Sequence, residues 1–122
     1  MNSAPARLAF PRARRLTRAS EFARVKTEGE SLHGRLLILG FLKLQNGGPF
    51  RAGLVTSRRL GEATVRNRVR RRIREIVRTE QARLRDGLWL VVVARPAAAH
   101  ASHLALRDEW LRLVERASIL AP

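Results

Sequence analysis

The sequence predicts an α+β domain in which helices cover a small mixed or antiparallel sheet. Three observations lead to this fold class. The chain has 122 residues, a length that suits one domain. A long stretch, Gly61–Asp86, has the apolar spacing of a helix, and apolar stretches of strand length lie on either side of it. The expected order is helix, three strands, helix, strand, helix, for which a two-layer sandwich is the simplest packing.

The central helix is predicted from the apolar residues of Gly61–Asp86, which recur at steps of three and four and fill one arc of a helical wheel. These residues are Val65, Val69, Ile73, Ile76, Val77 and Leu84. The opposite arc carries Asn67, Arg71, Arg74 and Arg78. We expect Glu75 to compensate Arg71 one turn away, and Gly87 to end the helix. One face of this helix is therefore suited to a core and the other to anions.

The charge of the chain indicates a polyanionic partner. The formal net charge is +15 and the pI is about 12.0. Like charges at helical neighbour spacing cost about 0.2–0.5 kcal/mol per pair, so a helix this rich in arginine is expected to bind an anion. Lys26 and Lys43 are the only lysines, and guanidinium groups grip phosphate bidentately. A solvated arginine face is the plain alternative, although such faces normally mix both signs of charge.

The N-terminal part divides into a tail and a first helix. Residues 1–14 are basic, contain two prolines and lack periodicity, so we expect a largely disordered tail before a domain at residues 15–120. The helix is predicted over residues 17–29, with Thr17 or Ser20 as its cap and Gly29 as its stop. The chain shows no continuous apolar signal segment, no run long enough to span a membrane and no cysteine. These features favour a cytoplasmic protein.

The strands are predicted from apolar runs bounded by turn residues. Leu36–Leu42 and Phe50–Ser57 are expected to form a hairpin across the Asn46–Pro49 turn. Leu88–Ala94 is the clearest strand, because it is rich in β-branched residues and bounded by a glycine. Ser102 can cap a last helix, whose charged residues, Glu109 among them, are expected mostly on the solvent side. The core stripe of that helix is Leu106, Trp110, Leu113, Val114 and Ala117.

No residue pattern indicates bond cleavage by the chain itself. A nuclease needs a general base, a general acid and usually a metal held by carboxylates or imidazoles. The acidic residues are scattered, His100 and His103 straddle the expected helix start, and neither His33 nor Ser57 has a catalytic partner nearby in the sequence. We therefore predict neither a catalytic residue nor a metal site in this chain.

The run Arg66–Arg71, preceded by Ser57–Gly61 and followed by Ile73–Glu75, resembles the signature of the bacterial ribonuclease P protein subunit. The resemblance extends from about Arg15 to about Leu120. It implies a left-handed β-α-β crossover through the arginine helix, where periodicity alone would suggest the usual right-handed connection.

The same resemblance implies an endoribonuclease that works as a ribonucleoprotein. In that family the RNA subunit carries the active site and its Mg²⁺ ions, while the protein helps to bind substrate and metal. The reaction is the endonucleolytic removal of the 5′ leader from precursor tRNA. The implied partners are a ribonuclease P RNA subunit and precursor tRNA, with no membrane and no DNA.

The resemblance also assigns residues when the motif is matched position by position. The residues expected to contact RNA are Arg58, Arg59, Arg66, Asn67, Arg68, Arg70, Arg71 and Arg74. Asn67 is expected to hydrogen-bond RNA or to help place a hydrated metal, with a plain helix-surface amide as the alternative.

The family has a cleft for the single-stranded leader between the first helix and the sheet, where single strands are held by stacking and positive charge. This chain offers Phe22, Lys26 and Arg51 for that role, with Phe22 as a plain core residue as the alternative. Lys26 and Gly40 stand where the family often has aromatic residues. Strand parity would turn the neighbouring Phe41 to the other face of the sheet.

A ribosomal or ribosome-assembly protein that binds structured RNA through the same basic face is the main alternative function. Such a protein would not stimulate cleavage of precursor tRNA by a ribonuclease P RNA. A DNA-binding helix would need more base-reading amides than Asn67 alone. A membrane-surface helix would need Trp or Phe anchors, which the central helix lacks.

Overall fold

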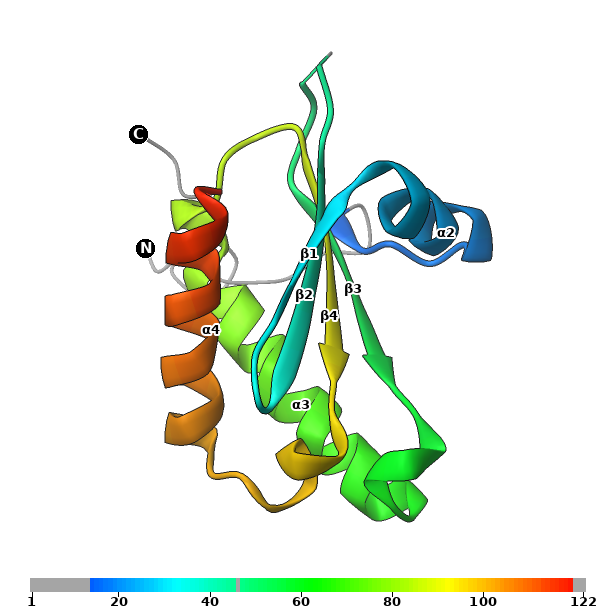
Figure 1. The fold of residues 1–122 in the computed structure, drawn as a ribbon, viewed down its shortest axis with the longest axis vertical. Coiled ribbons are helices and arrows are strands. Elements are labelled where there is room, and N and C mark those ends of the chain that lie inside the picture. Colours follow the sequence, from blue (N-terminus) through cyan, green and yellow to red (C-terminus); the bar gives the residue numbers. More distant parts are fainter. Residues whose placement is uncertain (1–13, 46, 120–122) are drawn as a thin grey trace, which may run out of the picture.

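The computed structural model describes residues 14–45 and 47–119 and shows an α+β sandwich (Figure 1). The predicted tail lies outside these residues, apart from Arg14. The predicted order of elements is confirmed. The elements are α2 (Ala19–Glu28), β1 (Glu30–His33), β2 (Leu37–Lys43), β3 (Arg51–Thr56), α3 (Ala63–Glu80), β4 (Leu88–Ala94) and α4 (His103–Ala117). Within the described ranges, no helix combines the length and the hydropathy that a membrane span requires.

The sheet is mixed, with strand order β1-β2-β4-β3. β2 is antiparallel to both β1 and β4, whereas β3 is parallel to β4. The predicted hairpin between Leu36–Leu42 and Phe50–Ser57 is wrong, because β4 lies between the two strands. β4 is buried along most of its length on both faces, so the central position removes the most apolar surface from water. β2 instead forms its hairpin with the short strand β1.

Helices cover the two faces of the sheet unequally. α3 and α4 pack on one face, while α2 alone lies on the other (Figure 1). The predicted apolar stripes of α3 and α4 are buried in the larger core, as expected from their helical period. Phe41 points into this core and Gly40 faces α2, which confirms the predicted strand parity. The left-handed crossover from β3 through α3 to β4 stays a prediction.

The boundaries of two helices differ from the predicted ones. α3 ends at Glu80 and not at Gly87. The segment after Glu80 leaves the helix because its backbone forms hydrogen bonds with distant parts of the chain. Arg85 donates its N–H to the carbonyl of Ile119 at 3.0 Å, and Gly87 donates to Gly48 at 2.8 Å. Leu84 is still buried, but it lies beyond the helix.

The N-terminus of α2 is capped by a carboxylate and not by a hydroxyl. The cap residue is Arg18, and Glu21 Oε1 accepts the backbone N–H groups of Thr17 and Arg18, each at 2.9 Å. The predicted caps Thr17 and Ser20 are therefore wrong: Arg18 is the cap residue, and Glu21, in the first turn, reaches back to the backbone N–H groups that precede the helix. Gly29 ends the helix as predicted and donates its N–H to the carbonyl of Val25.

Glu109 corrects the prediction for the last helix. Ser102 caps α4 as expected, but Glu109 is buried and not solvated. Its carboxylate accepts the backbone N–H groups of Arg35, Leu36 and Leu37 at 3.1, 2.7 and 2.6 Å. Two of these donors lie in the turn between β1 and β2, and Leu37 begins β2, so the buried carboxylate on α4 satisfies backbone groups that are far away in sequence.

We expect Glu109→Ala to lower the free energy of unfolding by about 3 kcal/mol or more, because three N–H groups would lose a charged acceptor. Glu109→Gln should be less damaging, since one acceptor oxygen remains. Asp108→Ala, at the exposed neighbouring position, is the matched control. Urea unfolding measures all three variants. A Glu109→Ala protein as stable as Asp108→Ala would contradict this assignment.

Candidate nucleic-acid interface

The exposed arc of α3 carries guanidinium groups that no carboxylate in the described part of the chain neutralises. Arg66, Arg71 and Arg74 make no ion pair with any carboxylate in residues 14–45 and 47–119. The same holds for Arg58 and Arg59, which project from the 3-10 turn that leads into α3. Five of the predicted RNA-contacting arginines therefore present uncompensated charge along one helix and its entry turn.

Glu75 does not compensate Arg71, contrary to the prediction. It forms its ion pair with Arg78, three residues further on. The hydrogen bond and charge of Arg78, against a smaller opposing effect of burial, lower the pKa of Glu75, and His103 adds to this. Within the predicted basic arc, Glu75 therefore cancels the charge of Arg78. The other members of the arc, Asn67, Arg71 and Arg74, are exposed.

Three further arginines of α3 are positioned by neutral oxygens. Arg68 donates to the carbonyl of Ala99 at 3.0 Å, and Arg72 donates to the carbonyl of Ala101 at 2.7 Å. Arg70 bridges the hydroxyl of Thr56 and the Oδ1 atom of Asn67. Because none of these acceptors is charged, each guanidinium group is oriented while its positive charge is retained.

Arg58, Arg59, Arg66, Arg71 and Arg74 form a basic face. A cation from outside α3 adds to this basic face. Residues 14–16 run beside β3. Leu16 donates its N–H to the carbonyl of Ala52 at 2.8 Å, and Arg15 forms a parallel β-bridge with the same residue. Burial by neighbouring groups lowers the pKa of Arg74, and the charges of Arg15 and Arg70 lower it further. The position of Arg15 could not be predicted from the sequence, because it depends on pairing with the distant residue Ala52.

The basic face is hollowed where α3 meets the start of α4. This hollow of about 380 Å³ is lined by Arg68, Arg71, Arg72, Glu75 and His103. Within the described ranges, no three His, Cys, Asp or Glu side chains gather around a common point, and His100 and His103 belong to no such group.

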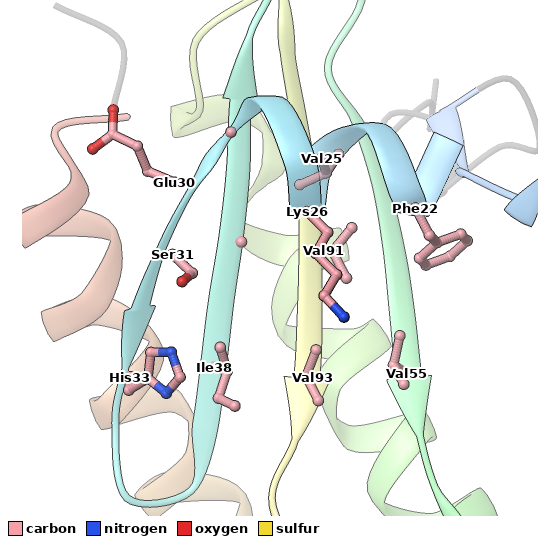
Figure 2. Close-up of a pocket in the computed structure, with 12 residues that line it drawn as sticks. Phe22, Val25, Lys26, Glu30, Ser31, His33, Ile38, Val55, Val91 and Val93 are labelled. Carbon is pink, nitrogen blue, oxygen red and sulfur yellow. The ribbon is translucent and has the colours of Figure 1, made fainter. Parts of the chain in front are cut away.

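A groove of about 440 Å³ lies on the opposite face of the sheet, between α2 and the strands. Its floor is apolar and includes Ile38, Val91 and Val93, with Gly40 beside Val25 (Figure 2). Lys26 reaches over the groove from α2. Lys26 and Phe22 thus line the same groove, and their contact with an RNA leader stays a prediction.

Phe22 has a double role in this groove. It is half-buried and lines the opening, yet it also packs on Gly53 of β3. A Cβ atom at position 53 would lie 2.4 Å from Cζ of Phe22, so the ring can approach the sheet only where a side chain is missing. The two positions predicted for Phe22, in the core and in the groove, therefore each describe part of where its ring lies.

Arg51 does not line the groove with Phe22 and Lys26. Its guanidinium group donates to Glu21 Oε2 at 2.7 Å and to the carbonyl of Arg15 at 2.8 Å. It also lies 5.3 Å from the ring centroid of Trp89. Arg51 therefore joins α2, the segment before it and β3, and a carboxylate already cancels its charge.

These features define a small α+β protein with an arginine-covered helix on one face of the sheet and an apolar groove on the other. Residues 10–118 match the family model described as Ribonuclease P. The ribonuclease P protein component of Symbiobacterium thermophilum is 41% identical over 109 residues, which cover 89% of this chain and 95% of that relative. The chain belongs to the ribonuclease P protein family.

Solved structures of the same family have this fold. The ribonuclease P protein of Thermotoga maritima matches with a TM-score of 0.73 and 29% identity, covering 84% of this chain and 96% of that one. The Staphylococcus aureus protein matches with a TM-score of 0.82, covering 90% of this chain and 100% of that one. At 24% identity the second likeness concerns the fold alone.

The Glu21 carboxylate should stabilise α2 in a pH-dependent manner. Backbone N–H bonding at Arg18, with further bonds from Thr17 and Arg51 and against the effect of burial, lowers its pKa from 4.5 to about 2. A lowered folded-state pKa stabilises the protein above the unfolded value, and this contribution is lost as the pH falls through about 4.5 towards 2.

The difference in free energy of unfolding between the wild type and Glu21→Gln should therefore be larger at about pH 6 than at about pH 2.5. Glu28→Gln removes an exposed carboxylate from the same helix and is the control. Chemical denaturation at the two pH values tests this. An equal difference for Glu21→Gln at both would refute the assigned role of the carboxylate.

Proposed function

We propose that this chain is the protein subunit of a ribonuclease P ribonucleoprotein that removes the 5′ leader from precursor tRNA. Membership of the family makes it a participant in an RNA-processing ribonucleoprotein endonuclease. The observation that supports a direct RNA contact is the cluster of Arg66, Arg71 and Arg74, which no carboxylate in the described part of the chain neutralises. We assign this basic face of α3 to the catalytic RNA subunit.

The chemistry of the basic face suits structured RNA. Phosphate oxygens accept paired N–H bonds from guanidinium groups, and each contact releases counterions from the RNA. Arg68, Arg70 and Arg72 are already oriented by neutral acceptors, so they lose less side-chain freedom when phosphate arrives. Asn67 adds an amide on the same exposed arc, although its Oδ1 atom already accepts from Arg70 at 3.3 Å.

The groove suits a single-stranded segment, and we assign it to the 5′ leader. Its apolar floor can hold base surface, the ring of Phe22 can stack, and Lys26 supplies positive charge for a phosphate. Arg51 contributes indirectly, because it ties α2 to β3 and so fixes one wall of the groove.

Asn67, the residue expected to help place a hydrated metal, does not fit a protein-held Mg²⁺ site. Mg²⁺ prefers carboxylate, phosphate and water oxygens. The only oxygen donor assigned a metal role, Asn67 Oδ1, faces the guanidinium group of Arg70, which would repel a cation. We therefore assign Mg²⁺ to the RNA subunit and the substrate, and no reaction step to a metal on this chain. Cleavage is assigned to the RNA subunit, and no residue of the chain is assigned a catalytic role.

Reconstitution tests the proposed function. The full chain, its RNA subunit and a precursor tRNA are mixed at limiting Mg²⁺, and leader removal is compared with and without protein. We expect the protein to stimulate cleavage and to cut nothing alone. Absence of stimulation would favour a different RNA-binding role, and cleavage by the polypeptide alone would overturn the assignment of the active site to RNA.

Replacing Arg71 and Arg74 together by alanine should weaken binding to the RNA subunit and flatten its salt dependence. Each lost phosphate contact should reduce the slope of log K against log salt by roughly 0.7–0.9. Arg112→Ala with Arg116→Ala removes the same charge from the exposed side of α4 and is the matched control. Filter binding at several salt concentrations measures both slopes. Equal slopes for the two double variants would remove the phosphate assignment from α3.

The groove assignment predicts a difference between the two lysines. Lys26→Ala should weaken binding of precursor tRNA to the reconstituted enzyme by about two- to fivefold, because one partly exposed charge contact is lost. Mature tRNA, which lacks a leader, should bind unchanged. Lys43→Ala, at the exposed end of β2 outside the groove, should affect neither ligand. A Lys26 effect that is the same for mature tRNA would show that the leader does not lie in the groove.

A further inference from the structure

The groove occupies only part of the sheet face that α2 covers. Gly40, Val91 and Gly53 are paired across β2, β4 and β3, and they form the row beneath α2. Val25 lies above Gly40, and Phe22 lies above Gly53. The row on one side of α2, which includes Ile38 and Val93, forms the groove floor (Figure 2).

The next row lies on the other side of α2 and consists of Leu42, Trp89 and Arg51. These residues are two positions away from the central row in their strands, so their side chains point to the same face of the sheet as the groove floor. Trp89 and Leu42 pack in the same small apolar cluster as Val91 and Val93. α2 therefore separates two parts of one continuous face, the groove and the neighbourhood of Trp89.

Two guanidinium groups lie over the ring of Trp89, and they differ in how firmly they are held. Arg51 lies 5.3 Å from the ring centroid and is held by Glu21 and by the carbonyl of Arg15. Arg24 lies 5.5 Å from the centroid, and its ion pair with Glu28 is exposed on both sides. Exposed pairs of this kind contribute little, so Arg24 can leave the ring at small cost.

The two sides of α2 each carry a cation. Arg24 and Lys26 are two residues apart, which places them about 200° apart around the helix. Lys26 reaches over the groove, whereas Arg24 reaches over Trp89. An RNA strand that leaves the groove beside Lys26 would therefore meet a second positive charge and an aromatic ring on the other side of α2.

We infer that Trp89 is a second stacking site for single-stranded RNA. A strand that fills the groove continues across α2, stacks a base on Trp89 and draws Arg24 from the ring to a phosphate. A half-buried aromatic ring bordered by displaceable positive charge is what sequence-tolerant single-strand binding uses. The inference rests on the proposed function, because it requires RNA in the groove.

The geometry makes this site depend on RNA length. A helix with its side chains is about 10–12 Å across, so an RNA must be longer than one that only fills the groove if it is to pass α2 and reach Trp89. Short RNAs should fill the groove without reaching Trp89, and longer RNAs should occupy both sites.

The experiment compares single-stranded RNAs of about 4 and about 10 nucleotides on the full chain. Trp89→Leu keeps an apolar side chain beside α2 but removes the stacking surface. It should bind the long RNA about fivefold more weakly and the short RNA unchanged, and Trp89→Phe should restore most of the loss. In a Trp110→Phe background, where Trp89 is the only indole, the long RNA but not the short one should quench the tryptophan fluorescence.

The outcomes separate this inference from the proposed function. Equal weakening of short and long RNAs by Trp89→Leu would show that the ring only supports α2, and unchanged binding of both would show that RNA does not reach it. Either result would overturn the stacking site while leaving the groove assignment intact. Failure of the wild-type chain to bind RNA of either length would overturn the groove assignment and this inference together.

Discussion

The structure depends on the burial of the apolar arc of α3. This burial keeps the helix folded although the arginines on its opposite arc repel one another. Val69, Ile73, Ile76 and Val77 are at most 1% exposed. Burying an aliphatic side chain of this size contributes about 1.5–3 kcal/mol, so the four together contribute about 6–12 kcal/mol. Each like-charge pair on the exposed arc costs about 0.2–0.5 kcal/mol. Burial outweighs repulsion, so the helix stays folded although its exposed arc concentrates positive charge.

The chain uses arginine in two physically different ways. On α3, neutral oxygens from Thr56, Ala99 and Ala101 orient guanidinium groups and leave their charge available for an outside anion. At Arg51 a carboxylate, a carbonyl and a tryptophan ring surround the guanidinium group, whose charge then supports the fold. Sequence alone does not distinguish these uses, because the acceptor that decides between them comes from another element.

Features set by local periodicity could be predicted from the sequence, whereas features set by distant pairing could not. The buried stripes of α3 and α4 follow from a period of 3.6, and the Ser102 cap follows from local chemistry. The place of β4 between β2 and β3 does not, since strand order depends on long-range burial. The hairpin prediction failed for that reason.

The same division holds for the site. The basic arc of α3 and the place of Phe22 and Lys26 along one groove could be anticipated, but the approach of Arg15 to Arg74 and the cluster around Trp89 could not. The burial of Glu109 could have been predicted from its spacing in the sequence. It lies three residues after Leu106 and four before Leu113, on the apolar stripe, where a charged residue implies a buried partner.

β3 links the two candidate surfaces, because successive residues of a strand point to opposite faces of its sheet. Val55 lines the groove, while the next residue, Thr56, holds Arg70 on the basic side. Gly53, two residues before Val55, receives the ring of Phe22 on the groove side. A strand paired along its length to the buried β4 cannot shift one face without the other. The basic face of α3 and the groove beside α2 are therefore held in fixed register, so an RNA bound on one face constrains where a strand in the groove can lie.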